Sequence, residues 1–213
     1  MAQTLAQLRY WTQYLVGDPQ MTTYTSTMYK DAINFAIKDY AAKTGATYFE
    51  TTSLPDAQGF LTLPTDYISI TRVLYPIGGV ATQLVSGSLK FETLKFNTWS
   101  TLTGTPSRWL IWGGSKARII PYPASPTNAT IGYIQKPTDL ALDSDTVDAR
   151  IPDAHNEYLK YAAGYWLLHL DGDAQNVQQA MQYMSEFNGL IGFADPVLTV
   201  KLNQARTEGK REV

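Results

Sequence analysis

The segment "GFLTLPTDYISITRV", residues 59–73, decides the fold class, because it has the pattern of β structure in a chain whose two ends carry helical patterns. Aromatic, aliphatic and β-branched residues dominate it, as is typical of strands. Pro64 fixes its own φ angle and favours an extended conformation at Leu63. We therefore predict two strands that meet at a corner.

More segments with strand character follow this corner, about ten residues apart, which is typical of a compact β-sandwich or barrel. They read "TQLVS", "SRWLIWG", "KARIIPYP" and "ATIGYIQKP", and the turn clusters that separate the segments are Gly78-Gly79, Gly87, Gly104-Thr105-Pro106 and Gly113-Gly114. The stretch "GGSK", residues 113–116, lacks the spacing of a phosphate-binding loop, and we predict a hairpin turn there.

Helical periodicity marks both ends of the chain. Apolar residues from Leu5 to Leu15 recur every three or four positions, and a second such stripe follows the hydroxyl-rich residues 22–27 and ends at Gly45. After the strands, "IPD" at residues 151–153 favours a helix start, and one helix is predicted from there to Leu170. The sequence Asp171-Gly172-Asp173 then predicts a turn into a fourth helix, packed antiparallel on the third.

Composition and charge exclude several classes of protein. Hydrophobic residues make up 44% of the chain and charged residues 17%, as in ordinary globular proteins. A formal net charge of −2 provides no basic field for sequence-specific nucleic-acid binding, and the absence of cysteine excludes disulfides and thiolate chemistry. The N-terminus lacks the pattern of a signal peptide, and no apolar run is long enough to span a membrane. We expect a soluble protein that is made in the cytoplasm and makes no membrane contact.

A search for chemistry-bearing groups finds no catalytic, metal or cofactor site. His155 and His169 are the only histidines, and on one helix they would lie about 21 Å apart, too far to share a metal ion. Asp143, Asp145 and Asp148 lack the glycine and glutamate of a calcium loop, so we expect a solvated acidic loop. Asp171 and Asp173 are interpreted as a helix end and a helix N-cap. The sequence predicts a protein without cofactor or metal and without enzymatic activity.

Aromatic residues of the β segment support an alternative function. They could form a stacking platform for sugars, which would make the chain a carbohydrate- or ligand-binding module, but core and cross-strand packing explains them equally well. These residues are Trp99, Trp109, Trp112, Tyr122 and Tyr133. A weaker third hypothesis is an enzyme with a site assembled across domains, which would need a deep pocket with several titrating groups.

The order of four segments resembles the head-to-tail adaptor (connector, head completion) proteins of tailed bacteriophages over nearly the whole chain. The most specific features are the Leu63-Pro64 corner, the Gly104-x-Pro106 turn before an aromatic strand, "IIPYP" at residues 119–123 and the "IPD" helix start. The four segments are "AINFAIKDYAAKTG", "GFLTLPTDYISITRVLY", "GTPSRWLIWGGSKARIIPYPASPTNATIGYIQKPTDL" and "IPDAHNEYLKYAAGYWLLHLDGDAQNVQQAMQYM".

This resemblance implies an α+β fold in which a helical bundle from both chain ends carries an inserted antiparallel β-sandwich or barrel domain and an extended C-terminal tail. The expected boundaries are 1–46 and 139–192 for the bundle, 47–138 for the β domain and 193–213 for the tail. The implied function is that of a structural virion protein in the neck between head and tail. It forms a ring, expected to be a dodecamer, under the portal protein, binds tail or nozzle proteins, and lets genome DNA pass for ejection without sequence-specific binding.

The resemblance also implies that the C-terminal tail reaches the portal protein. Apolar and polar residues alternate in the segment "DPVLTVKLNQ", as is required of a strand added to a neighbouring sheet or of a segment bound in a groove. The alternative is a terminus that binds no partner. The residues expected at this portal interface are Phe193, Pro196, Leu198, Val200, Leu202 and Arg206.

Overall fold

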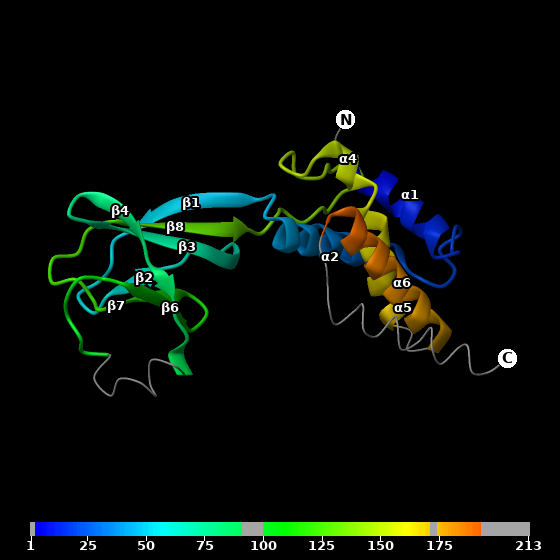
Figure 1. Cartoon of the computed structure of the whole chain (residues 1–213). Helices are drawn as coiled ribbons and strands as arrows, with labels where there is room; N and C mark the ends of the chain where they lie inside the picture. Colours follow the sequence, from blue (N-terminus) through cyan, green and yellow to red (C-terminus); the bar gives the residue numbers. More distant parts are fainter. Residues whose placement is uncertain (1–2, 91–99, 171–173, 193–213) are drawn as a thin grey trace. The chain divides into compact units, whose positions relative to one another are not determined.

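The computed structural model describes residues 3–90, 100–170 and 174–192, and the chain divides into two compact units (Figure 1). Met1–Thr47 together with Pro137–Val213 form the helical unit, and Tyr48–Lys136 form the β unit. Among the described residues, the named helices all lie in the first unit and the named strands in the second, so the α+β class predicted from the sequence is confirmed.

The helical unit is built around α5, which packs against α1, α2 and α6. Its large buried side chains include Leu8, Tyr29, Tyr40 and Phe187. The helices are α1 (Leu5–Leu15), α2 (Ser26–Thr44), α4 (Asp153–Asn156), α5 (Leu159–Leu170) and α6 (Ala174–Leu190). Within the described residues, no helix is both long and apolar enough to cross a membrane.

Side-chain caps set the helix ends that the sequence predicted. Thr4 and Gln7 form a capping box at the start of α1, and the Thr25 hydroxyl accepts the Met28 amide at the start of α2. Gly45 ends α2 with a φ angle of 70°, a left-handed conformation that glycine adopts without strain.

The prediction of one continuous helix from residue 151 to Leu170 is wrong. The structure has two helices there, α4 and α5, because the chain tightens between them: the Tyr158 amide donates to His155 O and the Tyr161 amide to Tyr158 O, three residues back instead of four. His155 and His169 therefore lie on different helices.

Asp18 organises the connection between α1 and α2. Its side chain is 4% exposed and accepts the backbone amides of residues 22–24 as well as the Tyr29 hydroxyl, at 3.1 Å. Burial acts to raise the pKa of Asp18, but the amides of Tyr24, Thr22 and Thr23 outweigh it and lower the pKa to about 2. The sequence predicted a helix stop here but not this buried carboxylate.

The segment that returns from the β unit, residues 137–152, is tied to α1 and α2 by polar contacts. The Asn34 amide group donates to Leu140 O at 3.1 Å and accepts the Leu140 amide at 2.8 Å. Arg9 donates to both carboxylate oxygens of Asp143, at 2.8 and 2.7 Å. These contacts join residues that lie more than a hundred positions apart in the sequence.

The β unit is a sandwich of two sheets, each with four named strands. The first sheet has the order β1 (Tyr48–Ser53), β8 (Ala129–Gln135), β3 (Tyr67–Ile77), β4 (Val80–Gln83) and is antiparallel throughout. The second has the order β2 (Phe60–Thr62), β7 (Lys116–Ile120), β6 (Arg108–Trp112), β5 (Val85–Ser86), in which only β5 and β6 are parallel. Both sheets contribute to one buried cluster that includes Leu61, Val73, Trp109, Ile119 and Ile131.

The corner at Leu63-Pro64 carries the chain from one sheet to the other, since β2 belongs to the second sheet and β3 to the first. Leu63 is buried, and its amide donates to Ser115 O at 3.0 Å. The predicted "GGSK" hairpin turn is confirmed between the antiparallel strands β6 and β7. The corner predicted from the sequence therefore connects the two sheets of the sandwich.

We expect Asp18→Asn to lower the free energy of unfolding by about 1–3 kcal/mol at pH 7. The NH₂ group of the asparagine cannot accept the hydrogen bonds that the second carboxylate oxygen of Asp18 accepts from backbone amides. The folded pKa of about 2 lies below the ordinary value of 3.8, so the charge stabilises the fold above pH 3.8, and this contribution is lost as the pH falls through 2. The difference in thermal midpoint between the two proteins should therefore shrink from pH 6 to pH 2. Asp31→Asn, at an exposed position of α2, is the control; a difference that stays constant with pH would contradict the role of the Asp18 charge.

Candidate interaction site

Within the described part of the chain, no group of three or more histidine, aspartate or glutamate side chains could hold a metal ion. His155 lies beside the Tyr40 hydroxyl, with 2.6 Å between Nδ1 and the oxygen, and stacks on Tyr158. His169 stacks on Tyr165. Both histidines thus contact aromatic side chains of the helical unit.

Of the three aspartates expected in a solvated acidic loop, Asp143 is exposed and pairs with Arg9 of α1, whereas Asp145 and Asp148 are half-buried and bond within the loop itself. The Arg9 guanidinium lowers the pKa of Asp143, the amides of Leu142 and Ala141 lower that of Asp145, and Arg150 lowers that of Asp148. Each carboxylate therefore has a structural partner. Asp171 and Asp173, interpreted as a helix end and an N-cap, lie outside the described residues.

The aromatic residues considered for a sugar platform do not share one exposed surface. Trp109 and Tyr133 are each only 4% exposed. Trp112 is exposed and packs edge to face with Phe60, and Tyr122 is half-buried. Trp99 lies outside the described residues. Burial of Trp109 and Tyr133 in the β unit favours the packing interpretation of these residues over the platform.

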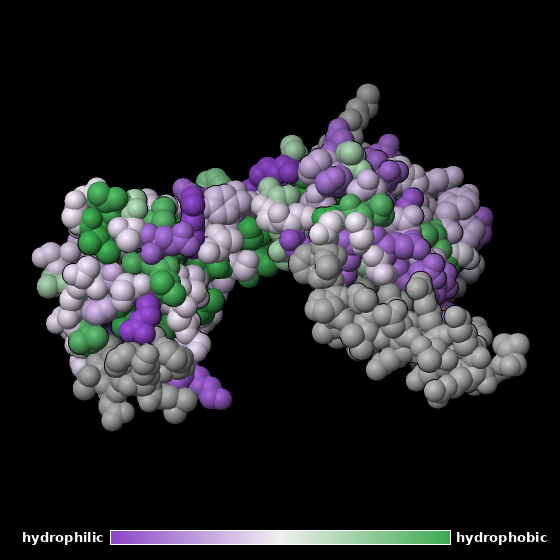
Figure 2. All heavy atoms as spheres, viewed as in Figure 1, coloured by the Kyte–Doolittle hydropathy of each residue, from purple (hydrophilic) through white to green (hydrophobic). Residues whose placement is uncertain are grey.

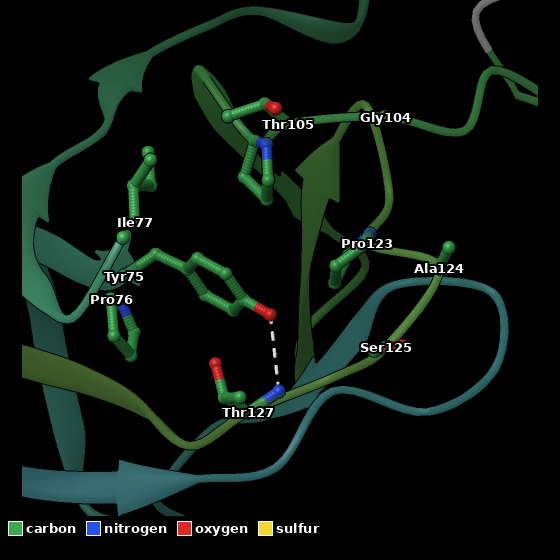
Figure 3. Close-up of a pocket in the computed structure, with 11 residues that line it drawn as sticks. Tyr75, Pro76, Ile77, Gly104, Thr105, Pro123, Ala124, Ser125 and Thr127 are labelled. Carbon is green, nitrogen blue, oxygen red and sulfur yellow. Dashed lines mark hydrogen bonds between the residues drawn. The ribbon is translucent and has the colours of Figure 1, made fainter.

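The β unit has a hollow of about 360 Å³ whose lining carries no charged side chain (Figure 3). We call it the β-unit hollow. In Figure 3 the Tyr75 ring extends across it, and its hydroxyl accepts the Thr127 amide at 3.0 Å. The lining residues are Tyr75, Pro76, Ile77, Gly78, Gly104, Thr105, Pro106, Pro123, Ala124, Ser125 and Thr127. Three prolines and one aromatic ring give it stiff walls, whose surface is partly apolar and partly uncharged polar.

This hollow lies at the end of the first sheet opposite the two points where the chain enters and leaves the β unit. Tyr48 pairs with Ile134, so the start of β1 and the end of β8 lie side by side at one end. Thr127 precedes the other end of β8, a strand of seven residues that spans about 20 Å. The β-unit hollow is therefore separated, by about the length of β8, from the two points where the chain enters and leaves the β unit.

Apolar side chains are also exposed around the β unit. On the face seen in Figure 2, green patches are spread over the β unit, whereas the visible surface of the helical unit is mainly pale and purple. Val80, 67% exposed, follows the turn at Gly78, and Leu102, 41% exposed, precedes Gly104. Single exposed apolar side chains are common on protein surfaces, and these two lie close in sequence to Gly78 and Gly104, which line the β-unit hollow.

The sequence profile of the SU10 adaptor protein family matches residues 2–206. This chain belongs to that family. No curated protein matches the chain. The resemblance to bacteriophage head-to-tail adaptors is confirmed by a match that covers both units of this SU10 adaptor, and the family is one of structural phage proteins rather than enzymes.

The portal-interface residues predicted for this SU10 adaptor, Phe193, Pro196, Leu198, Val200, Leu202 and Arg206, lie outside the described residues. Sequence reasoning did not find the β-unit hollow, because its walls come from three separate segments around Tyr75, Gly104 and Pro123. The local signals were Gly104-Thr105-Pro106, interpreted as a turn, and Pro121 and Pro123, interpreted as the end of the strand segment "KARIIPYP".

In the SU10 adaptor, Tyr75→Phe should leave the ring in place but remove the acceptor of the Thr127 amide. Tyr75 is 3% exposed, so the unpaired amide should lower the free energy of unfolding by about 1 kcal/mol and speed hydrogen exchange at Thr127. Tyr67→Phe is the matched control, since the Tyr67 hydroxyl donates to Gly114 O at an exposed position where water can replace it. Equal effects of the two substitutions on stability would contradict this role of Tyr75.

Proposed function

We propose that this adaptor forms a ring, expected to be a dodecamer, on the portal protein, joins the head to the tail in the virion neck, and leaves a channel through which genome DNA passes. The family match over residues 2–206 carries this proposal. A net charge of −2 suits a channel that lets DNA slide, because it offers no general attraction for phosphate.

We infer a division of labour between the parts of the chain. The helical regions, 1–46 and 139–192, make the ring, and the β domain, 47–138, binds the next tail or nozzle protein. The uncharged β-unit hollow supports the second role, since it would accept an apolar loop of a partner without burying a charge. The C-terminal tail, 193–213, attaches the ring to the portal.

The competing hypothesis, a carbohydrate-binding module, has less support. It needs several aromatic side chains on one exposed face, and Trp109 and Tyr133 are buried. It also gives no role to the helical unit. An adaptor uses both units.

The experiment that tests this proposal is a mass measurement by light scattering, with negative-stain microscopy, on the protein alone and mixed with the portal protein of the same virus. Ring particles on the portal are the expected result. A protein that remains monomeric in the presence of the portal would refute the proposal, and binding to a glycan array would then support the module.

Deletion of residues 194–213 should leave the thermal midpoint and the circular dichroism spectrum unchanged, because the cores of the helical unit and the β unit lie in residues 5–187. The same deletion should abolish attachment to the portal, measured by co-sedimentation. Normal attachment of the shortened chain would show that the C-terminal tail is not the portal interface.

A further inference from the structure

The surface of α1 carries an exposed pair of tyrosines. Tyr10 and Tyr14 stand one helical turn apart, their ring centroids are 4.7 Å apart, and they are 55% and 60% exposed. The opposite face of α1, with Leu5 and Leu8, is buried. Exposed tyrosines of this kind are enriched among the residues that dominate protein interfaces. We call them the tyrosine pair.

A second hollow, about 500 Å³ in volume, lies in the helical unit between α2, α5 and the return segment, and we call it the helical-unit hollow. Phe35 and Trp166, with ring centroids 6.4 Å apart, are half-buried and provide aromatic surface inside it. Its full lining is Lys30, Asp31, Asn34, Phe35, Lys38, Asp139, Leu140, Ala141 and Trp166.

The two surfaces are both aromatic, and neither carries a net charge that would repel the other. Two lysines and two aspartates line the helical-unit hollow, so its formal charge sums to zero, and Lys38 already pairs with Asp139 at 2.6 Å. The exposed face of α1, Gln7 with the tyrosine pair, is uncharged. Tyrosine rings pack edge to face on other aromatic rings, and a tyrosine hydroxyl pairs with ammonium or carboxylate groups at a rim. An uncharged aromatic projection thus matches an aromatic hollow without net charge.

We propose that the helical-unit hollow of one copy receives the tyrosine pair of the next copy. This inference rests on the proposed ring and names the contact that closes it. The tyrosine pair lies on α1 and the hollow on α2, α5 and the return segment, so each copy offers two different patches, as a heterologous contact in a closed ring requires.

Two variants test the two sides of this contact. Tyr10→Ala with Tyr14→Ala removes the projection, and Ala141→Trp fills the hollow from an exposed position of its lining. Neither change touches a buried side chain, so the thermal midpoint should stay near that of the native protein. Each variant alone should lower the fraction of portals that carry a ring at least about tenfold, as expected for the loss of hot-spot aromatics. Leu54→Ala, at a position 60% exposed in the β unit, is the matched control and should assemble normally.

Cross-linking gives an independent readout because the chain has no cysteine. A double variant, Tyr14→Cys with Asp31→Cys, should form disulfide-linked dimers, trimers and longer ladders on the portal. An equal mixture of the two single-cysteine variants should stop at dimers of the two different chains. An absence of ladders, or rings that persist without the tyrosine pair, would overturn the contact while leaving the ring proposal intact. A native protein that forms no ring on its portal would instead overturn the proposed function.

Discussion

The pairing of β1 with β8 is the constraint on which the rest of the structure depends. Tyr48 lies opposite Ile134, so the chain enters and leaves the β unit at neighbouring points of one sheet. Residues 48–136 can therefore form a sandwich of their own, while the segments before and after them remain close enough to pack together. Arg9 can contact Asp143, and Asn34 can contact Leu140, because this pairing brings together segments that are more than a hundred residues apart in the sequence.

The polar contacts of the helical unit determine which surfaces it presents. Asn34 fixes residue 140 on α2 through two hydrogen bonds, and that residue belongs to the wall of the helical-unit hollow. Arg9 ties α1, the helix of the tyrosine pair, to the same return segment. The tyrosine pair and the helical-unit hollow are thus both held by contacts to the return segment. In the contact that we propose, neither surface would have to lose conformational freedom on association.

Sequence reasoning predicted features that depend on local chemistry. The Leu63-Pro64 corner, the "GGSK" turn and the start of α2 after hydroxyl-bearing residues follow from proline, glycine and threonine acting on their own neighbours, whereas the capping box of α1 was not predicted. It failed where distant contacts decide the outcome. The break between α4 and α5 occurs inside an unbroken helical pattern, and the burial of Asp18 depends on Tyr29 from the next helix. Both hollows are lined by segments that are far apart in the sequence, so a local sequence pattern cannot predict them.

The two hollows differ in a way that suits two kinds of contact. The β-unit hollow has no charged group in its lining, so binding there draws on apolar burial, shape and hydrogen bonds to uncharged groups such as the hydroxyls of Thr105 and Ser125. Two lysines and two aspartates surround the aromatic rings of the helical-unit hollow. This arrangement favours one orientation of a partner without adding a net charge that attracts it. Screening by salt acts on charged groups only, so a contact at the uncharged β-unit hollow should depend little on salt, whereas the charged side chains around the helical-unit hollow remain subject to screening. In the ring that we propose, interfaces without net charge would hold neighbouring proteins without attracting the phosphates of DNA in the proposed channel.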